Sequence, residues 1–544
     1  SMRISDIPAA IAGELSIRPQ QVESVITLLD DGNTIPFIAR YRKEATGSLE
    51  DEMLRQVETR LTYLRSLVKR QEEICARIEE QGKLTDELRA AIEAAEKLQT
   101  LEDLYRPYKQ KKRTRASIAR ERGLEGLANA MLLQRETGGT PEDIAASFVD
   151  AEKDVATAAD ALAGARDILA ETIMDEAELR RLMREKFWKS AVLETTLDAD
   201  AEEAQVFQMY DGYTEPVRTL PSHRILAVNR GEKKGCLSVR IAVDHEDNIE
   251  WIYKRIYQRP SIFEGELHAA IEDGYKRLLV PALERELRTQ LTEAAEEKAI
   301  SVFGHNLRQL LLQPPLAGHT VLGLDPGYRT GCKVALVDAT GNVRASDVIQ
   351  LTRSDGERKA ATQSLLRLIK AHGITLISIG NGTASYETEQ FVAALIRDNN
   401  LKDVHYLITN EAGASVYSAS QLAKEELPDY DVTIRGAVSI ARRVQDPLAE
   451  LVKIDPQAIG VGQYQHDVSQ KELKETLDAT VEDAVNYVGV DLNTASPALL
   501  NRIAGINTAI AKNIVAYRNE NGPFTSRTEL LNVPRLGPKA YEQA

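Results

Sequence analysis

One stretch of the chain, HTVLGLDPGYRTGCKVALVDATGNVRASDVIQL from His319 to Leu351, restricts the fold more than any other feature. It contains three apolar runs separated by turns at Pro326–Gly327 and at Thr340–Asn342, which is the pattern of three strands connected in sequence. A helical pattern, the strand ITLISIG, a second helix and the strand VHYLIT follow. The segment therefore predicts a mixed α/β domain inside a longer chain.

Three strands followed by alternating helices and strands is the order of a ribonuclease-H-like fold, in which the first strand ends at an active-site acid. Hydrolysis of a phosphodiester by two Mg²⁺ or Mn²⁺ ions needs several carboxylates that converge on metals about 3.5–4 Å apart. Asp325, Glu411 and Asp446 lie where this fold could use them, but Asn381 stands where a further acid is expected. An amide brings no negative charge to a divalent pair, so the pattern favours a domain that has lost catalytic capacity.

Each of these acids also has a structural interpretation. Asp325 and Asp446 both precede a proline, so they could cap a turn and a helix start respectively. Glu411 could serve only to pair with Arg442 or Arg443.

The stretch GNGTASYETE provides a second candidate site next to the expected acids. It would place Gly380 to Thr383 in a loop that runs into a helix N-terminus, where backbone amides could hold an anion. The same residues could equally form a tight turn with a serine or threonine cap.

The segment from Asp491 to Ala544 repeats one scheme twice, a helix, a short turn and a second helix, with turns at IAGINTAIAKNI and VPRLGPKAY. In a helix-hairpin-helix motif such a turn exposes N–H groups at the start of the second helix, so a phosphate is bound without any base being read. We expect left-handed backbone at the glycine positions of each turn, with asparagine as the next-best residue for it. Lysines inside each following helix would add charge. The expected contacts are Gly505, Asn507, Lys512, Arg535, Gly537 and Lys539.

The densest basic stretch is YRPYKQKKRTRASIARER, from Tyr105 to Arg122, in which eight Lys/Arg accompany one acid, Glu121. It is consistent with a phosphate-binding patch, with candidate contacts at Lys111, Lys112, Arg113 and Arg115, and equally with a solvated helix face. The piece that follows, ASIARERGLEGLANAM, contains two short helical patterns broken at Gly123. It predicts either a helix-turn-helix-like pair or an ordinary helical hairpin.

The rest of the chain is largely helical. Apolar residues at three- and four-residue spacing continue from Ile4 to about Asp198, and helices resume from Gly265 to Leu312. Between them, Glu215–Tyr257 has β-rich alternation around a turn at Gly231–Gly235, which predicts a small sheet. The expected domains are 1–198 (helical, with the helix-turn-helix-like part), 199–258 (small β-containing segment), 259–318 (helical), 319–455 (ribonuclease-H-like) and 456–544 (helix-hairpin-helix).

Composition places the chain among multidomain soluble proteins. A length of 544 residues is too long for one core, and no apolar run reaches the roughly 18 residues that crossing a bilayer requires. The three cysteines are far apart and show no metal-binding spacing, so we expect a reducing cytoplasm, no zinc site and no disulfide framework. The formal charge of −15 argues against indiscriminate coating of nucleic acid. Ser1 ahead of Met2 is expected to be a remnant of cloning.

Several long motifs, taken together, resemble the Tex family of transcription accessory proteins, bacterial relatives of the eukaryotic elongation factor Spt-six. The resemblance covers essentially the whole chain. The motifs are IPFIARYRKEATGSL, LEDLYRPYKQKKRTR, PSHRILAVNRGEKKG, LGLDPGYRTGCKVALVDATG, IGNGTASYETE, EAGASVYSAS, RGAVSIARRVQDPLAELVKIDPQAIGVGQYQHDV and VGVDLNTASPALL.

The resemblance implies an elongated, mainly helical protein with a YqgF-type ribonuclease-H-like domain and tandem helix-hairpin-helix motifs. It also implies sequence-tolerant binding of RNA or single strands, and an OB-fold domain beyond residue 544. In related Holliday-junction resolvases, acids matching Asp325, Glu411 and Asp446 would be catalytic. The Tex pattern keeps Asn381, so the family does not imply catalysis.

Three hypotheses follow from these observations. The first is a non-catalytic scaffold for transcription that binds nucleic acid, with RNA favoured, and needs no cofactor. The second is a nuclease or resolvase dependent on Mg²⁺ or Mn²⁺ that uses Asp325, Glu411 and Asp446. The third is an interaction hub that docks RNA polymerase or the ribosome, with nucleic acid incidental. None of them involves a membrane, and the sequence leaves the oligomeric state open.

Overall fold

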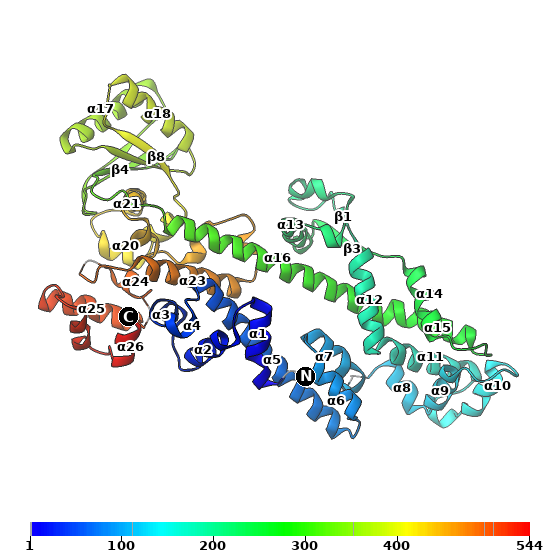
Figure 1. The fold of residues 1–544 in the computed structure, drawn as a ribbon. Helices are drawn as coiled ribbons and strands as arrows, with labels where there is room; N and C mark the ends of the chain where they lie inside the picture. Colours follow the sequence, from blue (N-terminus) through cyan, green and yellow to red (C-terminus); the bar gives the residue numbers. More distant parts are fainter. Residues whose placement is uncertain (1–2, 111–112, 352, 494, 504) are drawn as a thin grey trace. The chain divides into compact units, whose positions relative to one another are not determined.

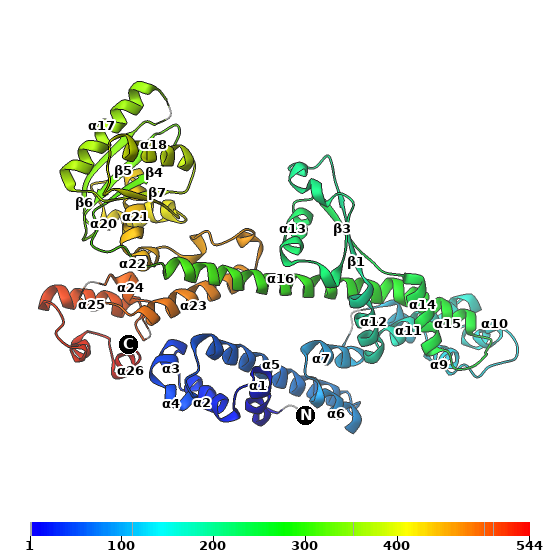
Figure 2. The same ribbon diagram turned by 45° about the horizontal axis from the view of Figure 1, so that its top comes forward.

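The computed structural model describes residues 3–110, 113–351, 353–493, 495–503 and 505–544. The chain forms two compact units, residues 1–27 with 53–297 and residues 28–52 with 298–544 (Figures 1 and 2). Among the described residues, none of the helices combines the length and the apolar character of a bilayer-crossing segment.

The first unit is mainly helical, as the apolar spacing predicts. The long amphipathic pattern forms one helix, α5, whose buried face repeats at Leu54, Val57, Leu61 and Leu64. The two patterns around Gly123 form two short helices, and this glycine has a φ of +77° between them. The helices are α1 (Ile7–Leu15), α2 (Pro19–Asp30), α5 (Asp51–Glu80), α6 (Asp86–Ala94), α7 (Leu98–Tyr105), α8 (Arg115–Glu121), α9 (Glu125–Leu133), α10 (Pro141–Ala145), α11 (Ala158–Met174), α12 (Ala177–Ser190), α14 (His245–Ile256), α15 (Glu264–Gly274) and α16 (Val280–Leu311), of which α2, α5 and α16 each cross a boundary between the units.

A small three-stranded antiparallel sheet interrupts these helices, but its strands are not all where the sequence pattern put them. Its order is β2 (Tyr213–Pro216), β1 (Val192–Leu197), β3 (Leu237–Ala242). The stretch from Ser222 to Lys233, expected as strand, forms helix α13 instead. Its apolar run ILAV has no alternation of its own, and a short run of this kind fits a buried helix as well as a strand.

The motif LEDLYRP takes part in a hydrogen-bonded network of ion pairs that connects three helices of the first unit. Asp103 on α7 is buried and accepts two hydrogen bonds from the Arg184 guanidinium on α12, at 2.8 and 2.9 Å. Arg184 also donates to Glu286 on α16 at 2.8 Å. A buried carboxylate is stable only when such partners replace the water it has lost, so this motif has a structural role.

The second unit contains the predicted α/β domain. Its five-stranded sheet has the order β6-β5-β4-β7-β8, with β4 antiparallel to β5 and parallel to β7. This arrangement confirms the ribonuclease-H-like topology. The strands are β4 (Val321–Asp325), β5 (Cys332–Val337), β6 (Val343–Ile349), β7 (Leu376–Gly380) and β8 (His405–Thr409).

Alternate residues of the strands pack against different helices, because side chains of a strand point to opposite faces. Leu322 and Leu324 pack with α17 (Asp355–His372) and α18 (Ser385–Asp398), whereas Val321 packs with α21 (Val432–Gln445) on the other face (Figure 2). Gly323 also faces α21, and a Cβ there would collide with the carbonyl oxygen of Ala437. Short helices α19 (Ala414–Ser418), α20 (Gln421–Glu426) and α22 (Pro447–Leu451) complete this part.

The carboxyl-terminal part of the second unit is helical and packs on a segment from near the amino terminus. Its helices are α23 (Gln470–Val488), α24 (Pro497–Leu500), α25 (Thr508–Asn521) and α26 (Pro538–Gln543). Helices α3 (Ile35–Tyr41) and α4 (Lys43–Thr46) lie beside them (Figure 1). Arg40 donates to the carbonyl of Asn486 at 2.9 Å, and Thr34 donates to the buried amide of Gln543.

We expect Gly323→Ala to lower the midpoint of thermal unfolding, by the equivalent of about 1–3 kcal/mol, because the added methyl group must push α21 away from the sheet. The matched control is Gly356→Ala on α17, where a Cβ would meet nothing closer than 4.0 Å. Scanning calorimetry of both variants checks this; equal midpoints would contradict the close packing of α21 on β4.

Candidate nucleic-acid interface and carboxylate pair

The two carboxyl-terminal turns adopt the same backbone conformation despite their different sequences. Gly505 in the first turn and Arg535 in the second both have left-handed backbone, with φ of +81° and +67°. The next residue of each turn, Ile506 or Leu536, is buried in a shared apolar core. The prediction of two related hairpins is therefore confirmed at the level of the fold.

The second expected glycine position behaves differently from the prediction. Asn507 has a φ of −92° and Gly537 a φ of −84°, so neither is left-handed. Asn507 is the N-cap of α25, and its side chain accepts a hydrogen bond from the Ile510 N–H at 2.8 Å. Asparagine is favourable at an N-cap as well as in a left-handed turn, so the residue type alone did not determine the conformation of Asn507.

The first hairpin presents an open helix start to solvent. Asn507 and Thr508 are exposed, and α25 continues for 14 residues behind them. Lys512, one turn into the helix, is exposed too, and no carboxylate of the described part of the chain pairs with it. A helix N-terminus carries partial positive charge and unpaired N–H groups, so this arrangement can accept a phosphate.

The second hairpin is partly occupied by the protein itself. Lys539 donates from its Nζ to the carbonyl of Asp31 at 3.0 Å, and α26 begins with Pro538, which has no N–H to offer. Gly505 packs on α26, where a Cβ would lie 2.8 Å from the Ala540 carbonyl oxygen. The Arg535 side chain is exposed to solvent at this turn. The helix start of the first hairpin is thus the more accessible of the two.

The basic loop lies in the first unit, whereas the hairpins lie in the second. Lys111 and Lys112 fall outside the described residues, and Arg113 and Arg115 are exposed. Burial raises the pKa of Asp167, and the nearby charges of Arg277 and Arg115 oppose that shift. Arg115 therefore faces an acid of its own unit.

The structure brings Asp325, at the carboxyl end of β4, close to Glu411, which follows the edge strand β8. Burial raises the pKa of the Asp325 carboxyl, and the charge of Lys333 partly offsets it. Burial likewise raises the pKa of Glu411, and the neighbouring Asp325 charge raises it further. Two carboxylates in one half-buried site resist simultaneous ionisation, which is a property of metal-binding and acid–base sites alike.

The Glu411 carboxylate fills the glycine loop that the sequence marked as an anion site. It accepts a hydrogen bond from the Gly382 N–H, and a Cβ at Gly380 or Gly382 would collide with it. Asn381 accepts a hydrogen bond from the Glu411 N–H at 3.1 Å and so fixes the same corner. The loop therefore binds an anion, but that anion is the protein's own side chain.

Asp446 lies away from this pair. It caps α22 by accepting a hydrogen bond from the Ala449 N–H at 3.1 Å, as its structural interpretation predicts. Asp325 lies beside Gly436 near the start of α21, whereas Asp446 follows the last residue of that helix, about 15 Å further along its axis. Over the described residues, the structure contains no group of three or more His, Cys, Asp or Glu side chains that could hold a metal.

A residue that sequence reasoning named only as a partner is central to this site. Arg443 is 4% exposed, donates to the Asn410 carbonyl at 2.7 Å, and lies within electrostatic range of Glu411 and Glu450. Burial lowers its pKa to about 10, so it is still charged at neutral pH. The sequence pattern places Arg443 on the apolar face of α21, and this position could have identified it, because a buried arginine needs carboxylates nearby.

The fold and these sites define a multidomain protein that joins a ribonuclease-H-like domain to a tandem helix-hairpin-helix segment. The chain belongs to the Tex family. It matches a Tex-like protein N-terminal domain over residues 5–79, a Tex central region-like domain over 136–303, the Tex protein YqgF-like domain over 319–445 and a helix-hairpin-helix motif over 485–544.

Several relatives match nearly the whole chain. The Bacillus subtilis protein YdcI is 49% identical over 98% of this chain and 74% of its own length. The transcriptional accessory protein Tex of Neisseria gonorrhoeae is 49% identical over 99% of this chain and 71% of its own. The human S1 RNA-binding domain-containing protein 1 is 39% identical over 99% of this chain and 55% of its own.

We expect Asp325→Asn to raise the thermal midpoint at pH 7, because burial penalises the charged carboxylate. The Asp325 carboxyl binds its proton more tightly in the folded chain than in the unfolded chain. Burial therefore destabilises the fold only at pH values where this carboxyl is ionised. This destabilisation shrinks as the pH falls towards the ordinary pKa of 3.8. Midpoints of both proteins across this range check the prediction; a gain that grows on acidification would contradict it.

Proposed function

We propose that this chain binds the sugar–phosphate backbone of nucleic acid without regard to base sequence. The matched turns at Gly505 and Arg535 carry this proposal, because the first leads into an open helix start at the protein surface and the second places the exposed Arg535 side chain at its turn. Backbone N–H groups at such a start recognise phosphate and carry no information about bases.

The charge distribution supports a local rather than a global attraction. The whole chain has a formal charge of −15, so attraction to nucleic acid must come from local basic groups and not from the net charge. Lys512 and Arg535 stand at the two hairpins without a carboxylate partner among the described residues. A few phosphate contacts of this type give modest affinity that falls steeply with salt.

We place this binding in transcription, in the cytoplasm, with RNA as the favoured partner. One relative is named a transcriptional accessory protein and another an S1 RNA-binding domain-containing protein. RNA polymerase or the ribosome is the protein partner that such a role requires. The ribonuclease-H-like domain then acts as a platform, since Asp446 does not join Asp325 and Glu411.

We expect Lys512→Ala to weaken binding of a short single strand about three- to tenfold, equally for unrelated sequences, because one charged phosphate contact is lost. The slope of log affinity against log salt should also become shallower by about 1. Lys402→Ala is the matched control, an exposed lysine of the α/β domain. Fluorescence anisotropy over a salt series measures both quantities. A loss confined to one sequence, or an equal loss in the control, would show that the hairpin is not the backbone site.

A second candidate function rests on the one observation that favours it, the proximity of Asp325 and Glu411 with raised pKa values. A Mg²⁺- or Mn²⁺-dependent nuclease would need both. We expect the wild-type chain to leave branched DNA and RNA intact in Mn²⁺, because no third carboxylate of the described residues joins the pair. Gel assays over a metal titration test this. Cleavage that disappears in Asp325→Asn would establish the nuclease and displace the platform role.

A further inference from the structure

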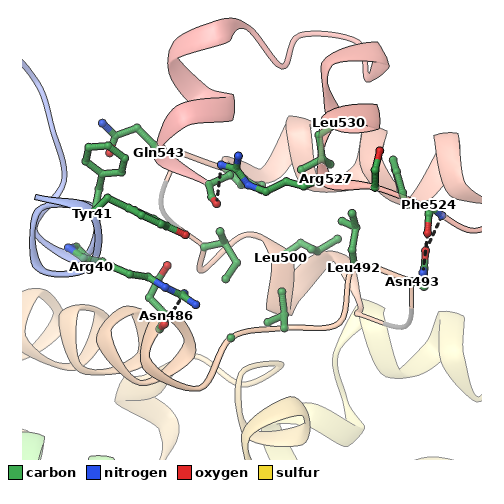
Figure 3. A pocket seen from close by; sticks show the side chains of 18 of the residues that line it. Arg40, Tyr41, Asn486, Leu492, Asn493, Leu500, Phe524, Arg527, Leu530 and Gln543 are labelled. Atoms are coloured by element: carbon green, nitrogen blue, oxygen red, sulfur yellow. Dashed lines mark hydrogen bonds between the residues drawn. The ribbon is translucent and has the colours of Figure 1, made fainter.

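A cavity of about 420 Å³ lies beside the first hairpin, within the second unit (Figure 3). Helix α3, the end of α23, the first turn and the loop at Phe524–Leu530 enclose it. Its floor is apolar, with Leu500, Phe524 and Leu530 among the buried residues that line it. Sites that hold small organic groups have this size, roughly 300–1,000 Å³, and this apolar character.

The charged side chains that line the cavity are all cationic. Among its lining residues no aspartate or glutamate occurs, but two arginines do, Arg40 and Arg527. Arg40 donates to the Asn486 carbonyl at 2.9 Å, and Arg527 donates to the main-chain oxygens of Tyr541 at 2.6 Å and Ala544 at 3.4 Å. These contacts orient both guanidinium groups, and no carboxylate side chain of the described residues pairs with either. The cavity therefore favours an anionic ligand.

An aromatic ring, that of Tyr41, reaches into the cavity and packs against the ring of Phe37, with the two centroids 5.3 Å apart. Tyr41 is 40% exposed and extends from α3 into it, with its hydroxyl directed towards the middle (Figure 3). The amide of Asn493 is already used in two hydrogen bonds with the backbone of Phe524, at 2.7 and 3.1 Å. The cavity thus offers stacking and positive charge but little that could distinguish one base from another.

The cavity adjoins the phosphate site of the first hairpin. Ile506 lines it, and the next residue, Asn507, is the exposed N-cap of α25. If a phosphate of a nucleic-acid strand binds at the start of α25, the base of the same nucleotide lies close to the cavity. In a duplex this base is stacked inside the helix, whereas in a single strand it is free to turn outward.

We propose that this cavity takes one unpaired nucleobase of the bound strand, stacked on Tyr41, with a neighbouring phosphate held by Arg40 and Arg527. The inference rests on the proposed function, since the hairpin must first hold the strand. It makes tight binding depend on an unpaired base next to the hairpin, whichever base that is.

Three ligands test the proposal by fluorescence anisotropy at one salt concentration: oligothymidylate, the same strand made of abasic nucleotides, and the matching duplex. The wild-type chain should prefer oligothymidylate to the abasic strand. Tyr41→Ala should weaken oligothymidylate roughly 5- to 150-fold, the range of one base–aromatic stack, and leave the abasic strand and the duplex within about twofold. Tyr41→Phe should retain the preference, because it keeps the ring.

The control is Tyr386→Ala, a 69% exposed tyrosine on α18 that does not line the cavity, and it should change nothing. If Tyr41→Ala has no effect, or weakens all three ligands alike, the base pocket is refuted. If wild type holds the normal and abasic strands equally, the pocket fails while backbone binding stands. If it holds neither, the proposed function itself fails.

A second measurement is independent of how Tyr41→Ala folds. A strand carrying 5-bromouracil should photocrosslink to the peptide that contains Tyr41 in the wild-type chain, as mapped by mass spectrometry. Crosslinks found only outside the cavity would overturn the proposal.

Discussion

Left-handed backbone at one residue of each carboxyl-terminal turn is the constraint on which the proposed nucleic-acid site depends. It reverses the chain so that a buried side chain follows and the next helix starts at the surface. At Gly505 only glycine fits, because a Cβ would lie 2.6 Å from the Cβ of Gln543. Arg535 faces solvent and accepts the same conformation at a cost of about 1–2 kcal/mol. The two hairpins thus differ in sequence because they differ in what packs on them.

Packing on the second hairpin joins distant parts of the chain. The loop before α3 reaches Lys539 and Gln543 through Asp31 and Asn33, and the motif IPFIARYRKEATGSL follows directly. It supplies Arg40 and Tyr41 to the cavity beside the first hairpin. A motif from the amino terminus therefore forms part of a site that the carboxyl-terminal sequence alone would not reveal.

The α/β domain shows how a catalytic geometry is occupied by the protein itself. Its glycine loop has the backbone of an anion site, but the Glu411 carboxylate lies in it and contacts the Gly382 N–H. Arg443 lies within electrostatic range of that carboxylate, and Asn381 accepts a hydrogen bond from the Glu411 main-chain N–H. The loop is therefore filled by the protein's own side chain, in agreement with the platform role proposed for the domain.

The sequence predicts the order of strands and helices along the α/β domain and the two hairpins, because alternation and turn residues are local properties. It predicts a strand where α13 forms, since the run ILAV is compatible with both a helix and a strand. It also predicts a left-handed conformation for Asn507, which is an N-cap instead, because asparagine is favourable in both positions. The contact of Lys539 with Asp31 and the cavity at Tyr41 join residues more than 440 positions apart. No local pattern encodes such pairs, and only the folded chain reveals them.

Hydrogen–deuterium exchange with and without a short single strand tests the central claim most directly. If phosphate rests on the start of α25, the amides that follow Asn507 should exchange more slowly in the complex, while those at the start of α18 keep their rate. Unchanged exchange at α25 in a saturated complex would contradict the account.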